Sequence, residues 1–376
     1  MSEFTERQEE IAKAVAETGS HRKAADKLGV HHSTVDHAMR KMARKGRAPG
    51  HFNSGTAPGF TMGKVTIQRN DLGEVERTWE RQHPDLSQEH IEAFIESFAS
   101  SLPRARKVAP PKETADDLMV VLPMGDPHFG MYAWAQECGD DFDLKIARED
   151  LCNAVKYLVD QTPPAARCVI VNLGDFYHAD NMAGITTRSG HVLYMDTRLP
   201  KMYEVGVLAL RQCIETALRR HKTVEIINAV GNHDEVLSFT LSTLLKNVYE
   251  NEDRVYVHSE PTLRHYVRHG KIFFGVTHGH RTKDSDLPGI MATERAKDWG
   301  ETKFRYFFRG HHHHDSVKEY NGCIVEQFRT LAAGDSYAVG GGYLSGRDMK
   351  ALVMHKDFGI LQRFVCGIDY LRALRA

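Results

Sequence analysis

Five short polar clusters between residues 126 and 314 contain the residue types that hold metal ions. Each combines Asp, Asn or His with a glycine or proline, and each follows an apolar run. The clusters are Asp126-Pro127-His128, Gly174-Asp175-Phe176-Tyr177-His178, Gly231-Asn232-His233-Asp234, Thr277-His278-Gly279-His280 and Gly310-His311-His312-His313-His314. Carboxylate, amide and imidazole donors together suit Mn, Fe, Zn or Co better than Mg or Ca, which prefer oxygen ligands alone.

This donor set favours the hydrolysis of phosphate esters with two divalent ions. Two cations about 3.5–4 Å apart neutralise the phosphate oxygens and deprotonate a bridging water. The carboxylate of Asp175 suits the bridging position between them. Because residues two apart in an extended segment point to the same side, we expect His311 and His313 to face the ions. His312 and His314 then point away.

The order of the motifs, DxH, GDxxH, GNHD, HGH and GHxH, resembles that of the calcineurin-like metallophosphoesterases over roughly residues 118–315. The resemblance implies one ion held by Asp126, His128, Asp175 and His313, and a second held by Asp175, Asn232, His278 and His311. Mn²⁺ is the first expectation for both ions, with Fe, Zn or Co as alternatives. His233 would contact the scissile phosphate and protonate the leaving oxygen, with Asp234 orienting it. His280 is expected behind the ligands.

His178 gives an indication of the substrate. Within that family, the GD-x-x-H motif resembles the nuclease subunit of double-strand-break repair complexes, where this histidine assists DNA cleavage. The alternative is that His178 only forms hydrogen bonds behind the ligands. The polar loop Asp180–Arg198 follows this motif, and Arg188, His191 and Arg198 are candidates for binding phosphate. They are equally well explained as surface charges, and Arg309 is expected to be structural.

The apolar runs before the clusters predict strands that are buried on both faces. Helical stretches at 150–160 and 201–220 alternate with them, which indicates an α/β fold whose ligands gather at the carboxyl ends of the strands. For residues 118–376 the family resemblance implies a layered metallophosphoesterase sandwich, with two central sheets flanked by helices. The runs at 323–332 and 350–367 are expected to close a sheet. Gly340–Gly342 is expected to form a flexible turn.

Residues 1–47 predict a separate all-α module, a helix-turn-helix. Helices are expected at Glu6–Thr18 and His21–Leu28, and in a third segment capped by Ser33, with Gly29 at positive φ in the turn. Eight basic residues against two acidic ones give residues 21–47 a local charge of +6, which suits a phosphate backbone. The candidate DNA-binding residues are Arg22, Lys23, Lys27, His32, Ser33, Thr34, His37, Arg40 and Lys41. A small helical interaction or dimerisation module is the alternative.

Residues 48–117 are expected to connect the two parts. Residues 48–63 and 103–112 are rich in Gly, Pro or small polar residues and are typical of linkers. A hairpin is predicted over 64–82 around the turn Asn70–Gly73, followed by an amphipathic helix over Ser87–Ser101.

Composition excludes several other classes of protein. The 376 residues carry a net charge of −1, so any affinity for nucleic acid must come from a local patch. The six cysteines have no CxxC spacing, which suits a reducing cytosol, and no apolar segment follows Met1 as a secretory signal would. We expect a cytoplasmic protein, in a bacterial or phage-infected cell, with DNA as a partner and no membrane contact. The sequence does not indicate an oligomeric state.

Three functions are compatible with these motifs. The first is a metal-dependent DNA nuclease, because a candidate DNA-binding module accompanies the phosphoesterase motifs, a combination that resembles phage-encoded phosphoesterases or DNA repair exonucleases. The second is a phosphatase or a small-molecule or cyclic-nucleotide phosphodiesterase. The third is a DNA-binding regulator with a vestigial phosphoesterase body, which the presence of all seven expected ligands disfavours.

Overall fold

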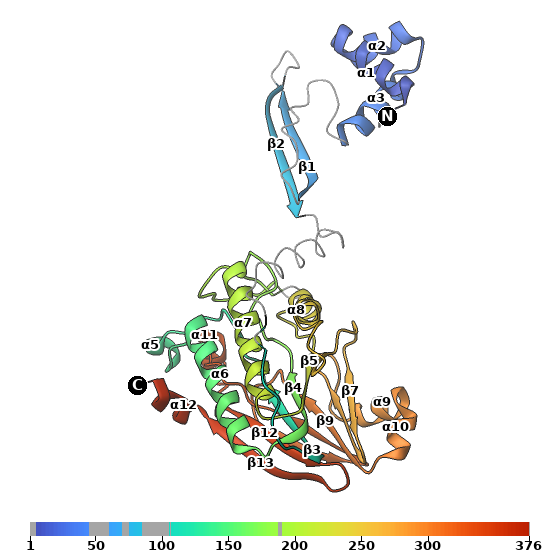
Figure 1. Cartoon of the computed structure of the whole chain (residues 1–376). Coiled ribbons are helices and arrows are strands. Elements are labelled where there is room, and N and C mark those ends of the chain that lie inside the picture. Colours follow the sequence, from blue (N-terminus) through green and yellow to red (C-terminus); the bar gives the residue numbers. More distant parts are fainter. Residues whose placement is uncertain are drawn as a thin grey trace. The chain divides into compact units, whose positions relative to one another are not determined.

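The structure, a computed structural model, describes residues 5–44, 60–69, 75–84, 105, 107–186 and 190–375. The chain divides into two compact units, Met1–Phe94 and Ile95–Ala376. Figure 1 labels most of the elements of both units. Within the described ranges, no helix combines the length and the apolar character needed to cross a bilayer.

The first unit begins with three helices, α1 (Glu6–Thr18), α2 (His21–Leu28) and α3 (His32–Arg44). The side chain of Thr5 caps α1 in a capping box with Gln8. Gly29 ends α2 at φ 63°, the left-handed conformation predicted for the turn. The prediction for Ser33 is wrong: it lies inside α3, and its backbone N–H donates to Nδ1 of His31 at 3.4 Å.

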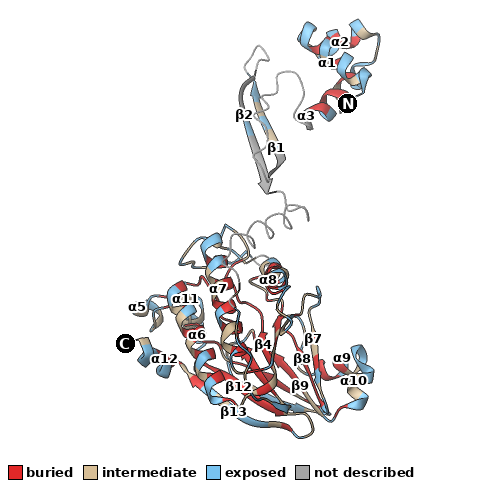
Figure 2. Ribbon diagram, viewed as in Figure 1, coloured by how far each residue is buried: buried red, intermediate tan, exposed pale blue. Residues whose placement is uncertain are grey.

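The three helices enclose a small apolar core. Figure 2 shows buried positions on the inner faces of the helices and exposed ones outside. The buried members are Ile11, Ala14, Val15, Ala24, Ala25, Val35, Ala38 and Met39. Four of the eight are alanines, and side chains of this size let helix axes approach closely.

The first unit also contains an antiparallel hairpin. Strand β1 (Phe60–Arg69) pairs with β2 (Val75–Pro84), and Phe60 lies opposite Pro84. The hairpin predicted over 64–82 is therefore present but longer, and residues 60–63 belong to a strand rather than to the predicted linker. The predicted turn at Asn70–Gly73 and the predicted helix Ser87–Ser101 lie outside the described residues.

Two mixed sheets form the centre of the second unit. The six-stranded sheet has the order β13-β12-β3-β4-β5-β6, and the five-stranded sheet has the order β10-β11-β9-β8-β7. Strands β3 to β6 are parallel in the first sheet, and β8, β9 and β11 are parallel in the second. The strands are β3 (Ala115–Met124), β4 (Ala165–Asn172), β5 (Thr223–Asn228), β6 (Val255–Val257), β7 (His265–His269), β8 (Ile272–Val276), β9 (Phe304–Arg309), β10 (Ser316–Tyr320), β11 (Cys323–Gln327), β12 (Asp348–His355) and β13 (Gly359–Gly367).

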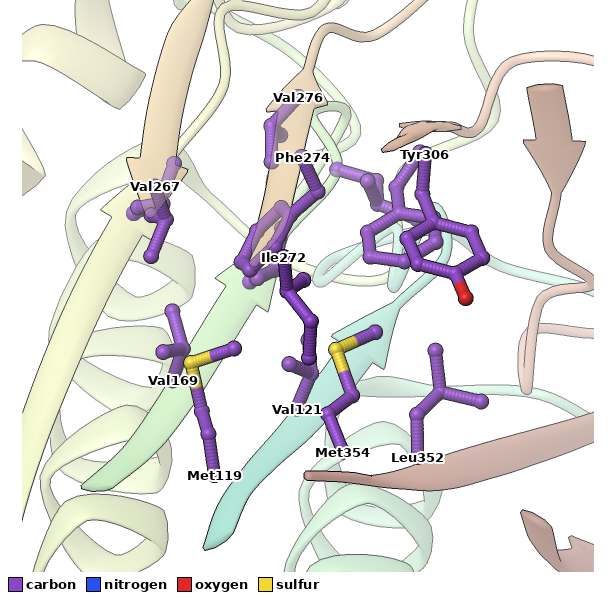
Figure 3. Close-up of a cluster of buried hydrophobic side chains, with 14 of the residues drawn as sticks. Met119, Val121, Val169, Val267, Ile272, Phe274, Val276, Tyr306, Leu352 and Met354 are labelled. Carbon is purple, nitrogen blue, oxygen red and sulfur yellow. The ribbon is translucent and has the colours of Figure 1, made fainter. Parts of the chain in front are cut away.

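The main core lies between the two sheets. Figure 3 shows Met119, Val121 and Val169 of the six-stranded sheet facing Ile272 and Phe274 of the five-stranded sheet. Because alternate residues of a strand point to opposite faces, Val120, Cys168 and Ile170 are buried on the other side of the first sheet. The continuous apolar runs of the sequence thus follow from burial on both faces.

Helices cover the outer faces of the sheets. Those in contact with the six-stranded sheet are α6 (Leu144–Gln161), α7 (Leu199–Leu218), α8 (Glu235–Val248) and α12 (Ile368–Arg375). Leu287 and Met291 of α9 (Leu287–Glu294) pack on Phe273 and Phe307 of the five-stranded sheet. Two short helices, α5 (Ala135–Cys138) and α10 (Ala296–Glu301), complete this part of the chain. The layered α/β architecture with two central sheets, predicted from the sequence, is the one found.

Two local predictions in this unit need correction. Strand β3 begins at Ala115, so residues 115–117 are part of the sheet rather than of the connecting segment. The glycine segment predicted as a flexible turn begins within a helix, α11 (Ser336–Gly340), which Asp335 caps by accepting from Ala338 N–H. The run at 323–332 contains β11, and the run at 350–367 forms most of the β12–β13 hairpin, which joins the six-stranded sheet at β3.

Candidate metal centre

The five polar clusters of the sequence meet at one edge of the sandwich. They follow the carboxyl ends of β3, β4 and β5 in one sheet and of β8 and β9 in the other. The carboxyl ends of parallel strands lie at a common edge, and this edge collects ligands in α/β folds. Here the two sheets contribute to a single centre.

The first ligand set consists of Asp126, His128 and His313, whose ligand atoms all lie within 4.8 Å of one another. Nε2 of His128 is 3.2 Å from Nε2 of His313. Nε2 of His313 is in turn 3.7 Å from Oδ1 of Asp126. Two imidazole nitrogens and a carboxylate oxygen therefore converge on a space of the size of one cation.

The second ligand set consists of Asp175, His278 and His311, again within 4.8 Å of one another. Nε2 of His278 is 3.1 Å from Oδ2 of Asp175 and 3.0 Å from Oδ1 of Asn232. The other nitrogen of His278 lies 2.8 Å from the carbonyl oxygen of Leu173. A backbone partner of this kind fixes the ring and directs Nε2 toward the ligand side.

The backbone is strained at these ligands. Five non-glycine residues in the described ranges have φ between 43° and 77°, and all five were predicted from the sequence as ligands: Asp126, His128, Asp175, His311 and His313. Left-handed backbone costs a residue with a Cβ about 1–2 kcal/mol. Strain of this kind persists where the surrounding structure enforces it, and it is concentrated at functional sites.

Two glycines are required because the ligands lie against their backbone. A Cβ on Gly231 would lie 2.1 Å from Oδ1 of Asp175, and a Cβ on Gly310 would lie 2.4 Å from Oδ2 of Asp126. Neither carboxylate could keep its position beside a larger residue. The glycines of the GNHD and GHxH motifs therefore make room for the two acidic ligands.

Burial holds most of the histidines in the neutral form that binds metals. It lowers the pKa of His311 to about 3 and that of His313 to about 4. Burial, with the neighbouring His313, also holds the pKa of His128 well below its usual range. His278 is the exception: burial opposes its charge, but Asp175 outweighs burial and raises its pKa to about 9.

The two carboxylates differ in their electrostatics. Burial raises the pKa of Asp126 to about 7. Burial would do the same to Asp175, but the positive charge and hydrogen bond of His278 outweigh it and hold the Asp175 pKa well below its usual range. Neutral imidazoles, carboxylates and an amide oxygen fit a pair of divalent transition-metal ions.

His233 and His178 lie beside the first ligand set. Their ring centroids are 5.1 Å and 5.2 Å from that of His128. Nδ1 of His233 is 2.9 Å from the carbonyl oxygen of His178, and Nε2 is 4.0 Å from Oδ2 of Asp175. Nδ1 of His178 is 3.2 Å from Nδ1 of His128, while its buried Nε2 has no hydrogen-bond partner among the described residues.

The expectation that Asp234 orients His233 is wrong. The carboxylate of Asp234 is fully buried and accepts the backbone N–H groups of Asp175, Tyr177 and Gly231, each at 3.2 Å. It therefore joins the loop after β4 to the loop after β5. The ring of His233 is oriented instead by the carbonyl of His178.

Sequence reasoning missed two residues that support the loops. Asp180 accepts the N–H groups of Val236 and Leu237 at 2.7 Å and 2.9 Å, so it caps the start of α8 just after the GNHD motif. The hydroxyl of Thr330 donates to the carbonyl of Asp126 at 2.7 Å. Asp180 lies two residues after His178 in the sequence, but no local pattern relates it to a helix that begins 55 residues later.

The remaining histidines of the motifs occupy the margin of the centre. His312 and His314 are exposed and stack on each other, with centroids 5.9 Å apart. The ring of His280 is 5.2 Å from that of His278, and its Nε2 accepts from Arg281 at 2.9 Å. Arg309 is buried and pairs with Asp284.

No described contact joins the candidate phosphate-binding residues to the centre. Arg188 lies outside the described residues. His191 and Arg198 are exposed, and Arg198 immediately precedes α7. Their role in binding substrate stays a prediction.

The candidate DNA-binding residues lie on the surface of the first unit. All nine are exposed. Lys27 is already paired with Glu17, with Nζ 2.5 Å from Oε2. The other four cations, on α2 and α3, have no ion-pair partner among the described residues: Arg22, Lys23, Arg40 and Lys41.

No family model matches this chain, and no curated protein does. Solved structures with some similarity include an archaeal phosphodiesterase at 14% identity, covering 66% of this chain and 100% of that one, with a TM-score of 0.34. A predicted phosphoesterase from Streptococcus pneumoniae has 10% identity, with 67% and 100% covered and a TM-score of 0.28. Vps29 from Entamoeba histolytica, complexed with Zn²⁺, has 12% identity, with 66% and 99% covered and a TM-score of 0.29.

Proposed function

We propose that this chain is a binuclear-metal phosphoesterase whose substrate is the phosphodiester backbone of DNA. One observation carries the first part: two ligand sets, each of one carboxylate and two imidazoles, meet at a single edge with strained backbone under five of their members. We infer that Asn232 completes the second set and that Asp175 is shared between the ions, as the motif resemblance implies.

Two divalent ions in these sets would neutralise the phosphate oxygens and activate a water for attack on phosphorus. The chain supplies the remaining groups. The carbonyl of His178 fixes the ring of His233, which leaves Nε2 on the ligand side, where it can stabilise or protonate the leaving oxygen. Asp234 holds the two loops at the distance that this arrangement requires.

Two observations favour DNA over a small phosphate ester. The ring of His178 lies against His128 with an unpartnered buried nitrogen, in the motif that resembles DNA-cleaving relatives. The first unit presents exposed cations on α2 and α3, which suit a phosphate backbone. A phosphatase or small-molecule phosphodiesterase uses the same centre and is the second candidate. The regulator with a vestigial body requires lost ligands, and all seven predicted ligands are present.

The substrate class is tested with the full chain and Mn²⁺ on three substrates: duplex or single-stranded DNA, bis-p-nitrophenyl phosphate and p-nitrophenyl phosphate. We expect cleavage of DNA and of the diester, and loss of both in His128→Ala. Preference for the monoester without DNA cleavage would favour the phosphatase. Tight DNA binding without bound metal would favour the regulator.

A further inference from the structure

A second group of metal-ligating side chains lies outside the centre described above. It occupies residues 258–265, the segment that connects β6 at the edge of the six-stranded sheet to β7 at the edge of the five-stranded sheet. His258, Glu260 and His265 each offer a ligand atom there, and these atoms lie within 4.8 Å of one another. None of the three belongs to the binuclear ligand sets.

His265 is a buried residue that lines a cavity. It is only 5% exposed. Its ring lies edge-on to that of His258, with centroids 6.1 Å apart. The two imidazoles can therefore offer their nitrogens to the same cation.

His258 has the surroundings of a metal ligand. Its Nε2 lies 3.5 Å from Oε2 of Glu225, and its Nδ1 lies 4.0 Å from Oε2 of Glu260. Glu225 is itself held by Arg167 at 2.7 Å. A histidine that binds a metal through one nitrogen usually donates its other N–H to a carboxylate, which sets the tautomer and the direction of the ring. Glu225 provides that carboxylate, and Nδ1 is left facing Glu260.

We propose that His258, Glu260 and His265 form a mononuclear cation site of the Zn²⁺ class, separate from the binuclear centre. Two imidazoles and one carboxylate are three of the four ligands that tetrahedral zinc takes, which leaves one position for water or a ligand atom. Glu260 and His265 line a cavity of ≈170 Å³, together with Ser259 and Thr262, so this position has room for water. A cation here ties together the edges of the two sheets.

Glu260 gives the sharpest test because its side chain is 57% exposed and its replacement leaves the core intact. Full-length protein is equilibrated with Zn²⁺, dialysed, and its zinc content per chain is measured by plasma mass spectrometry. We expect Glu260→Ala to hold one zinc fewer than the wild type. The matched control Glu250→Ala removes another exposed glutamate of the same unit and should leave the zinc content unchanged.

A second measurement tests whether the carboxylate of Glu225 supports His258 as a zinc ligand. Glu225→Gln should weaken zinc binding at this site by roughly 10- to 100-fold, while the number of ions at saturation stays the same. His265→Ala should lose the site altogether, with circular dichroism reporting whether it folds. Wild-type zinc content and affinity in both Glu260→Ala and Glu225→Gln would overturn the proposal. These measurements do not depend on phosphoesterase activity. If the protein proves to have no such activity, the variants should still differ from the wild type in zinc content and affinity.

Discussion

The metal centre and the N-terminal helices present polar side chains in opposite ways. At the centre the ligands are mostly buried, five stand on left-handed backbone, and glycines are needed beside the two carboxylates. On α2 and α3 the cations are exposed on regular helix. The centre holds a few atoms in fixed positions, so a single substitution there should cause a large loss of activity. The helices distribute charge over a surface, so each substitution there should weaken DNA binding only slightly, and the effects should add.

The largest effect is expected at Asp175, the carboxylate that we propose is shared by the two ions. Asp175→Asn removes the negative charge that offsets the cations, and metal-ion stabilisation is worth several kcal/mol of barrier, so hydrolysis of bis-p-nitrophenyl phosphate should fall about a thousandfold or more. The control Asp253→Asn changes an exposed carboxylate of the same unit. Full activity in Asp175→Asn would place the chemistry elsewhere.

His233→Ala should reduce kcat about a hundredfold, because we propose that the ring stabilises or protonates the leaving oxygen and does not hold an ion. Metal content should stay at the wild-type value, which separates this role from that of a ligand. The control is His314→Ala, which removes an exposed histidine of the neighbouring motif. Loss of metal together with activity would make His233 a ligand instead.

His221 is a buried histidine outside the candidate metal centre, and it should affect the stability of the fold rather than activity. Burial lowers the pKa of His221 to about 4, and its Nδ1 accepts from Ala165 N–H at 3.2 Å. Below pH 6.5, His221 is protonated in the unfolded chain but stays neutral in the folded chain. The free energy of unfolding therefore decreases as the pH falls from about 6.5 to 4. The loss amounts to about 3 kcal/mol at the acid end.

His221→Asn keeps an acceptor for Ala165 but cannot be protonated. The free energy of unfolding in urea should therefore fall less steeply with acid in this variant than in the wild type. His314→Asn, at an exposed position, is the control. Equal pH slopes in His221→Asn and the wild type would contradict the linkage.

The smallest expected effect is on DNA binding by the N-terminal helices. Arg22→Gln with Arg40→Gln should weaken DNA binding about tenfold at moderate salt and reduce the slope of log K against log salt by roughly two units. Cleavage of bis-p-nitrophenyl phosphate should not change. Lys145→Gln with Lys156→Gln on α6 is the matched control. An unaltered salt slope would favour an interaction module over a DNA-binding one.

The sequence predicted the layered fold because its signals are strong and local. Apolar runs that end at glycine and a donor residue identify parallel strands, and such strands bring their ends to a common edge. For that reason Asp126 and Asp175 could be expected at one edge, and the resemblance of the motif order added His278 to the same centre.

The roles of other residues depended on three-dimensional contacts. Asp234 follows His233 directly, but the loop directs the two side chains to different partners. Asp180 caps α8 because the two segments lie together in the fold, which the sequence around Asp180 does not indicate. The site at His258 and His265 lies in a segment without glycine or a repeating pattern, and it exists because two sheet edges come together.

The origin of the donors in two different sheets has a mechanical consequence. Loops of the six-stranded sheet provide the carboxylates and the amide, and loops of the five-stranded sheet provide three of the imidazoles. Apolar side chains fill the space between the layers, and polar contacts such as that of Arg363 with Glu326 join them elsewhere. Ions bound at this edge by ligands from both sheets would link the two sheets to each other. Chelation should then speed amide hydrogen exchange in β8 and β9, so that the rigidity of the sandwich depends on the supply of metal.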